Sequence, residues 1–133
     1  MAVTIGSGRE HEGRKLIPLM ESISIKQVKK GRPKKRPGVL YADTKYNMPL
    51  NILYLDGKRI KSQIPEVSTK KRRPGRPRLF IKTLYNKIRS MIERFYGWIK
   101  AFRRIIIRYE RLAITYLGFV HIACIILYLR ILK

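Results

Sequence analysis

The sequence contains few acidic side chains and one cysteine. Of its 133 residues, 8 are Asp or Glu and 31 are Lys or Arg, which gives a formal net charge of +23. The single cysteine, Cys124, cannot form an internal disulfide, so a disulfide-stabilised secreted scaffold is excluded. Because Cys124 lies in an apolar run, we expect a buried, unreactive thiol.

The scarcity of carboxylates also limits the chemistry. A mechanism that needs two carboxylates, or a metal ion held by carboxylates, must draw from a short set of side chains. These are Glu10, Glu12, Glu21, Asp43, Asp56, Glu66, Glu93 and Glu110.

The chain has an excess of positive charge and many hydrophobic residues. Hydrophobic residues make up 45% of the sequence, so the chain is able to bury a core and does not read as a disordered basic tail. The length fits one domain or part of one. A net charge of +23 repels itself strongly, and a polyanionic partner is therefore expected. Nucleic acid and anionic lipid are the two candidates.

Two short stretches, residues 29–37 and 70–78, concentrate the basic residues. Each holds six Lys or Arg in nine positions and contains Gly-Arg-Pro, so both are predicted to be loops or linkers. Neutralised phosphates release counterions, and these loops predict salt-sensitive, largely nonspecific DNA binding. The predicted DNA-binding residues are Lys29, Lys30, Arg32, Lys34, Lys35 and Arg36 in the first loop, and Lys70, Lys71, Arg72, Arg73, Arg76 and Arg78 in the second.

The part of the chain before the second basic loop has short apolar runs broken by turn residues. Residues 2–5 look like a short strand, and residues 14–25 look weakly helical, with an interruption at Pro18. Residues 39–42 then predict a buried strand that ends on Asp43.

A helix and another strand follow that buried strand. Residues 50–55 predict a short helix stopped by Asp56 and Gly57, and residues 60–64 alternate between apolar and polar as a strand does. Strand, helix and strand at this spacing indicate a parallel α/β unit.

The last third of the chain predicts two helices. Apolar residues recur every three or four positions, which is the pattern of a long amphipathic helix over residues 84–106. Residues 112–129 contain no Asp, Glu, Lys or Arg over 18 positions, about 27 Å as a helix. That length is near the threshold for crossing a membrane, so a buried core helix and a membrane span both stay open. The amphipathic stripe consists of Leu84, Ile88, Ile92, Phe95, Ile99, Phe102 and Ile106.

Asp43 and Glu93 are the carboxylates best placed for chemistry. Asp43 ends a predicted strand, and ligands of open α/β sheets bind at the carboxyl ends of the strands. Glu93 shares a helix face with Arg89 and Lys100. Two explanations of Glu93 remain open at this point. It forms a solvated ion pair with Arg89, or it contributes to a divalent-metal site for phosphoryl transfer.

Three stretches of the sequence resemble, in order, the insertion-sequence transposases of the DDE type. They are residues 4–12 (TIGSGREHE), 41–46 (YADTKY) and 93–100 (ERFYGWIK). Residues 102–104, 108–111 and 117–124 also resemble the C-terminal end of that family. The resemblance implies a ribonuclease H-like fold, here an incomplete α/β one, with short parallel-type strands followed by two long C-terminal helices.

The resemblance also implies roles for individual residues. Asp43 would be the family's second catalytic Asp and Glu93 its third catalytic acid, together binding Mg²⁺ or Mn²⁺. Arg89 and Lys100 would contact DNA phosphates. The family's signature has a Tyr seven residues before the Glu, where this chain has Asn86 with Tyr85 beside it.

The family's first catalytic Asp has no counterpart here, because it precedes the stretch that corresponds to residues 4–12. We therefore expect residues 1–133 to form a partial catalytic domain, with basic loops at 29–37 and 70–78 and C-terminal helices over 79–133. Such a chain would bind the DNA of transposon ends but would be inactive alone. An N-terminal transposase half or a second copy would be its protein partner, and the cytoplasm, at the nucleoid, its location.

Two other functions are compatible with the residues. Each Gly-Arg-Pro triplet is able to lie in a narrow minor groove, as in an AT-hook-like DNA-binding protein. Alternatively, residues 112–129 anchor a small basic protein in a membrane, with its basic loops against anionic lipid.

Overall fold

The computed structural model describes residues 2–6, 9–27, 31–66 and 79–132. Lys29, Lys30 and the second basic loop therefore lie outside the described residues. The chain divides into two compact units, which are described separately below. The first comprises Met1–Ala2 and Gly6–Tyr85, and the second comprises Val3–Ile5 and Asn86–Lys133.

The first unit begins with helical turns, and the strand expected over residues 2–5 is wrong. Those residues have no regular structure, since no strand within the described residues pairs with them. A 3₁₀ helix, η1 (Glu12–Lys15), leads into α1 (Leu16–Ser22). The interruption expected at Pro18 is also wrong. Pro18 lies in the first turn of α1, where its missing N–H loses no helical hydrogen bond.

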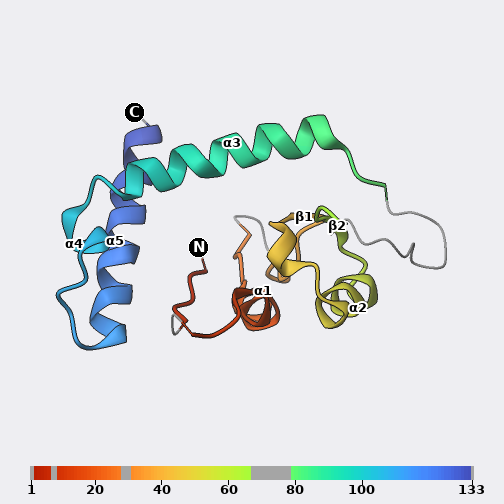
Figure 1. Cartoon of the computed structure of the whole chain (residues 1–133), viewed down its shortest axis with the longest axis horizontal. Helices are drawn as coiled ribbons and strands as arrows, with labels where there is room; N and C mark the ends of the chain where they lie inside the picture. The colour runs from red at the N-terminus through yellow and green to blue at the C-terminus, as the bar shows by residue number, and fades with distance from the viewer. Residues whose placement is uncertain (1, 7–8, 28–30, 67–78, 133) are drawn as a thin grey trace. The chain divides into compact units, whose positions relative to one another are not determined.

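A parallel strand–helix–strand unit follows, as the sequence predicted (Figure 1). Its elements are β1 (Val39–Tyr41), α2 (Pro49–Gly57) and β2 (Lys61–Gln63). The strands pair in parallel, with Val39 opposite Lys61 and Tyr41 opposite Gln63. Pro49 is in the first turn of α2, where its fixed φ favours the start of a helix.

The core of the first unit lies where α1, α2 and the two strands meet. Ile52 and Leu55 are three positions apart and thus share one face of α2. Leu55 is completely buried, whereas Leu53, on another face of the same helix, is 70% exposed. Apolar burial of this kind is the main stabilising contribution to the unit. The buried residues of this core are Leu16, Met20, Ile52, Leu55, Ile60 and Ile64.

Gln63 links the end of β2 to the segment that leads into α3 (Lys82–Ile99). Its side chain is buried; Nε2 donates to the Leu79 carbonyl at 2.7 Å, and Oε1 accepts from the Ile81 N–H at 2.9 Å. The side-chain amide thus makes the two hydrogen bonds that a neighbouring strand would otherwise make with the Leu79 carbonyl and the Ile81 N–H. Tyr85, near the start of α3, is buried and packs against Phe80, with the centres of the two rings 5.2 Å apart.

The second unit contains the rest of α3 and two further helices (Figure 1). The long amphipathic helix is confirmed, but its predicted end at Ile106 is wrong. The helix ends at Ile99, and Phe102 has an extended backbone before the short α4 (Arg103–Ile106). This break lets Phe102 and Ile105 both pack on the core that Ile99 forms with α5 (Ala113–Ile131). α5 confirms the helix predicted over residues 112–129.

Arginine and tyrosine side chains join α4 to α5. The Tyr116 hydroxyl donates to the Ile105 carbonyl at 3.0 Å. The Arg104 guanidinium lies 5.0 Å from the Phe119 ring centre, and the Arg108 guanidinium lies 5.5 Å from that of Tyr116. Cys124 is buried as predicted, and burial raises the pKa of its thiol, which therefore stays protonated near neutral pH.

α5 is the one helix in the described part of the chain that is long and apolar enough to cross a membrane. Its mean hydropathy reaches 1.9, and three of its residues, Ala123, Cys124 and Leu127, are buried. Core helices of soluble proteins meet the same criteria of length and composition, so this feature is weak evidence for a span. The membrane alternative stays a prediction.

The contrast between Leu55 and Leu53 gives a direct test of the first core. Leu55→Ala should lower the free energy of unfolding by about 2–5 kcal/mol, because it leaves a cavity in a fully buried position. Leu53→Ala, its matched control on the same helix, should change that free energy by less than about 0.5 kcal/mol. Urea unfolding followed by far-ultraviolet circular dichroism measures both. Equal losses for the two variants would contradict this packing.

Candidate active site and nucleic-acid interface

Asp43 lies at the carboxyl end of β1, as the sequence predicted. The residue is exposed, and its Oδ1 accepts a hydrogen bond from the Thr44 N–H at 2.7 Å. It thereby caps η2 (Thr44–Tyr46), a 3₁₀ turn that follows the strand directly. The backbone thus fixes one carboxylate oxygen at the edge of the sheet.

Two asparagines hold the turn that carries Asp43. Asn47 Nδ2 donates to the Pro65 carbonyl, just past β2, at 3.0 Å. The buried Asn51 donates from its own Nδ2 to the Gly13 carbonyl at 2.9 Å and to the Tyr46 carbonyl at 3.1 Å. The sequence reasoning missed both residues. The available signal for Asn51 was a polar side chain between apolar neighbours, Leu50 and Ile52, in the predicted helix.

The ends of the first two family-like stretches lie together in the first unit. Lys45, from η2, forms an ion pair with Glu12, from η1, at 3.4 Å. Gly13 is buried and packed tightly against residues 45–48. A Cβ added to Gly13 would lie 2.6 Å from Met48 Sδ and 2.8 Å from the Lys45 carbonyl oxygen. Next to it, His11 Nδ1 accepts from the Gly13 N–H, so the proton of the neutral imidazole is on Nε2.

The carboxylates from η1 and the turn before it are each paired with a lysine. Glu10 contacts Lys15 at 2.7 Å and Glu12 contacts Lys45 at 3.4 Å. Across the described ranges, no three His, Cys, Asp or Glu side chains lie close enough together to hold a metal ion. The described residues alone therefore do not fit a Mg²⁺ or Mn²⁺ site, and Asp43 would need ligands from elsewhere.

Glu93 and Arg89 form the i,i+4 ion pair that the sequence allowed. Arg89 Nε lies 2.9 Å from Glu93 Oε1, and the two side chains are 61% and 64% exposed. An exposed pair of this kind contributes little stability. Lys100 lies one position past the end of α3, and its N–H still donates to the Tyr96 carbonyl. Glu93 belongs to the second unit and Asp43 to the first.

Tyr85 is not a substitute for the signature tyrosine at position 86. Its ring is buried against Phe80, so it is not accessible to a DNA phosphate. The neighbouring Asn86 is exposed. This chain therefore has the side-chain amide of Asn86 at the position where the family's signature has a tyrosine.

The described part of the first basic loop is attached to the rest of the first unit at two points. Lys34 exchanges two backbone hydrogen bonds with Ile25, each of 2.9 Å. The Arg36 guanidinium donates to the Lys58 carbonyl at 2.8 Å. The sequence predicted a loop here, which is confirmed, but not these contacts. Its cationic side chains Arg32, Lys34, Lys35 and Arg36 are all exposed.

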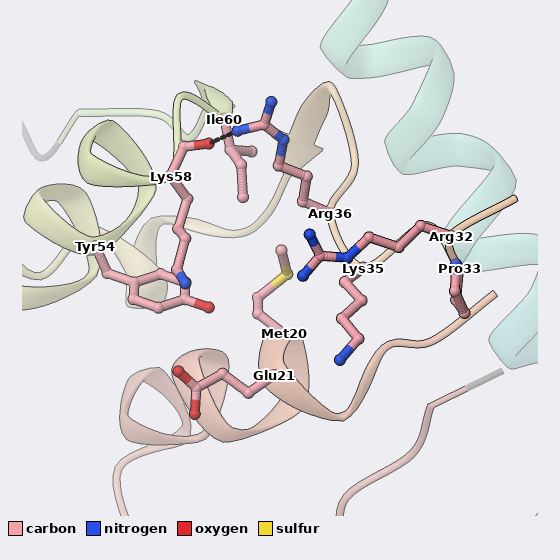
Figure 2. A pocket seen from close by; sticks show the side chains of 9 residues that line it. All are labelled: Met20, Glu21, Arg32, Pro33, Lys35, Arg36, Tyr54, Lys58 and Ile60. Atoms are coloured by element: carbon pink, nitrogen blue, oxygen red, sulfur yellow. Dashed lines mark hydrogen bonds between the residues drawn. The ribbon is translucent and has the colours of Figure 1, made fainter.

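This loop forms one wall of a hollow of about 400 Å³ (Figure 2). Helices α1 and α2 supply the facing side chains. The sequence reasoning missed Tyr54 and Lys58 as candidate site residues. They are four positions apart, but the predicted helix stopped before Lys58, whereas α2 extends to Gly57 with Lys58 as its C-cap. The lining consists of Met20, Glu21, Arg32, Pro33, Lys35, Arg36, Tyr54, Lys58 and Ile60.

Comparison with known proteins identifies the family. Residues 1–128 match the family described as "Transposase DDE domain", and the chain therefore belongs to the DDE transposases. The chain is 27% identical over 124 residues to a Burkholderia cepacia protein named as a transposase for insertion sequence element IS402. That match covers 93% of this chain and 54% of the relative, so the chain spans about half the length of this curated relative. No solved structure matches the chain.

Membership of this family agrees with the fold. The chain is mixed α/β, with two parallel strands followed by helices, and is consistent with part of a ribonuclease H-like DDE domain. Proteins of this family act on DNA and generally use divalent metal ions.

The close contact at Gly13 predicts that the junction between η1 and η2 tolerates no side chain. Gly13→Ala should lower the free energy of unfolding by about 1–3 kcal/mol, because the new Cβ would collide with a backbone oxygen. Gly38→Ala is the control, since its Cβ would meet nothing within 4 Å. Urea titration of both variants decides the matter. A Gly13→Ala variant as stable as Gly38→Ala would mean that the junction is looser than described.

Proposed function

We propose that this chain is the part of a DDE transposase that binds DNA and supplies two of the three catalytic carboxylates, Asp43 and Glu93. The observation that carries the proposal is Asp43, an exposed carboxylate that the Thr44 N–H fixes at the carboxyl edge of a parallel sheet. In open α/β folds, ligands bind at that edge. The third carboxylate, which would complete the set of ligands for Mg²⁺ or Mn²⁺, comes from outside this chain.

Glu93, Arg89 and Lys100 form the second part of the proposed site. Arg89 contacts the Glu93 carboxylate through Nε, and a planar guanidinium matches the geometry of a phosphate. The Arg89 and Glu93 side chains are both more than half exposed, so DNA is able to reach them without unfolding α3. We assign Arg89 and Lys100 to phosphate contacts and Glu93 to the catalytic acid of α3.

The proposed partners follow from charge and from the family. A chain with a net charge of +23 binds the DNA backbone strongly, and transposon ends are the DNA on which a transposase acts. An N-terminal transposase half supplies the missing carboxylate, and a second copy of the chain is the other candidate protein partner. The protein acts in the cytoplasm, held at the nucleoid by its DNA.

DNA binding should depend steeply on salt. Fluorescence anisotropy with a labelled duplex should show an affinity that falls about a thousandfold between about 50 mM and 200 mM salt, the drop for roughly six neutralised phosphates. Lys34→Gln should make the slope of log K against log salt shallower by about 1. Ser24→Ala, an exposed uncharged exchange, should leave it unchanged. An affinity that does not respond to salt would refute the electrostatic mode of binding.

Cleavage of DNA should be absent with this chain alone. Neither Mg²⁺ nor Mn²⁺ should support nicking of a supercoiled plasmid, because two carboxylates do not complete a two-metal centre. The proposal fails if the purified chain cleaves DNA and Glu93→Gln abolishes that activity while Glu66→Gln, at an exposed acid with no assigned role, retains it.

A further inference from the structure

The hollow beside the first basic loop combines features that the DNA-backbone contacts do not require. Its volume of about 400 Å³ falls within the range of pockets that hold small ligands. All of its lining residues belong to the first unit. Met20 and Glu21 come from α1, the loop contributes Arg32, Pro33, Lys35 and Arg36, and α2 with the following turn contributes the rest. Figure 2 shows these side chains gathered around one space.

The charge of the lining predicts an anionic ligand. Four cationic residues, Arg32, Lys35, Arg36 and Lys58, face one carboxylate, Glu21. Guanidinium groups bind phosphate oxygens through two parallel hydrogen bonds, and ammonium groups add point charges. A phosphate is therefore the ligand group that this lining fits.

The backbone of the loop that carries Arg32, Lys35 and Arg36 is held in position before any ligand binds. Arg36 donates to the Lys58 carbonyl, so the loop and the end of α2 are linked at the rim of the hollow. The paired backbones of Lys34 and Ile25 fix the middle of the loop, and Gln27 Nε2 donates to the Arg32 carbonyl at 3.3 Å. A wall fixed in this way has less conformational entropy to lose on binding.

The floor of the hollow is apolar and aromatic. Tyr54 is half-buried on α2, with the Lys58 ammonium 5.7 Å from its ring centre, and Met20 is buried beside it on α1. Burial, with a further contribution from Glu21, raises the pKa of Tyr54, so its hydroxyl remains a hydrogen-bond donor. Figure 2 shows the Arg32 side chain extending from the loop toward this floor.

We infer that this hollow binds one unpaired nucleotide of a DNA strand, with its phosphate on Arg32 and Lys58 and its base against Tyr54. The inference rests on the proposed function, namely that the chain binds DNA. A ring beside cations is the arrangement by which proteins bind single strands, since every base has a face that stacks on an aromatic side chain. A duplex covers those faces, so only an unpaired base reaches the floor.

The test compares single-stranded and duplex DNA with the full chain. Fluorescence anisotropy is measured with a labelled thymidine oligonucleotide and with a duplex of the same length. Tyr54→Leu should weaken single-strand binding about tenfold, a value typical of losing one base–aromatic stack, and leave duplex binding unchanged. Tyr54→Phe should retain both affinities, because it keeps the ring. Tyr109→Leu, which removes a 70% exposed tyrosine elsewhere, is the matched control.

A second pair of variants tests the phosphate contact independently of the core. Arg32→Gln changes an exposed loop side chain and should weaken single-strand binding roughly tenfold, the loss of one charge-assisted contact. Lys26→Gln removes the same charge from an exposed position outside the hollow and should weaken both DNA forms equally and by less. Circular dichroism confirms that each variant is folded.

The outcomes separate this inference from the proposed function. If the chain binds duplex DNA but Tyr54→Leu and Arg32→Gln bind single strands like the wild type, the inference is wrong and the proposed function stands. If thymidine monophosphate competes no better than inorganic phosphate, the hollow is an anion site without a base contact, and the inference is wrong again. If the chain binds neither DNA form, both are wrong.

Discussion

The parallel pairing of β1 with β2 is the constraint on which the first unit depends. Each strand has three residues, and so short a pair is not stable without the helices that cover it. Leu55, fully buried on α2, supplies that cover. The same pairing puts Asp43 at the carboxyl edge and Gln63 at the end of the second strand, where its amide binds the segment leading into α3. One short sheet thus positions the candidate acid and binds the segment before α3.

The distribution of charge follows from how few acids the chain has. Glu10, Glu12, Glu93 and Glu110 each lie beside a Lys or Arg, at 2.7, 3.4, 2.9 and 3.8 Å respectively. Such pairs neutralise only a few of the 31 basic residues. Exposed cations contribute little to stability, so the need for a stable fold does not account for this excess of positive charge. The proposed binding to DNA accounts for this excess.

Patterns among neighbouring residues in the sequence were sufficient to predict most of the helices and strands, but not the contacts between distant residues. Apolar runs predicted β1, α2 and α5, and the alternation of apolar and polar residues predicted β2. The end of a predicted strand indicated the position of Asp43. The strand expected over residues 2–5 failed because a strand needs a partner, and the break after Ile99 was missed because core packing overrides a continuous stripe. Asn51 and Gln63 act across 38 and 16 residues, and contacts at such separations leave no periodic trace.

The first basic loop shows why charge alone does not define a binding site. In a free linker, the four described cations would be interchangeable, and each would add the same salt-dependent contribution to DNA binding. The backbone bonds between Lys34 and Ile25, and the bond from Arg36 to the Lys58 carbonyl, remove that equivalence. Arg32 lines a hollow with an aromatic floor, whereas Lys34 does not line it. The contribution of each cation therefore depends on where the loop is held, so replacing one lysine or arginine is not equivalent to replacing another.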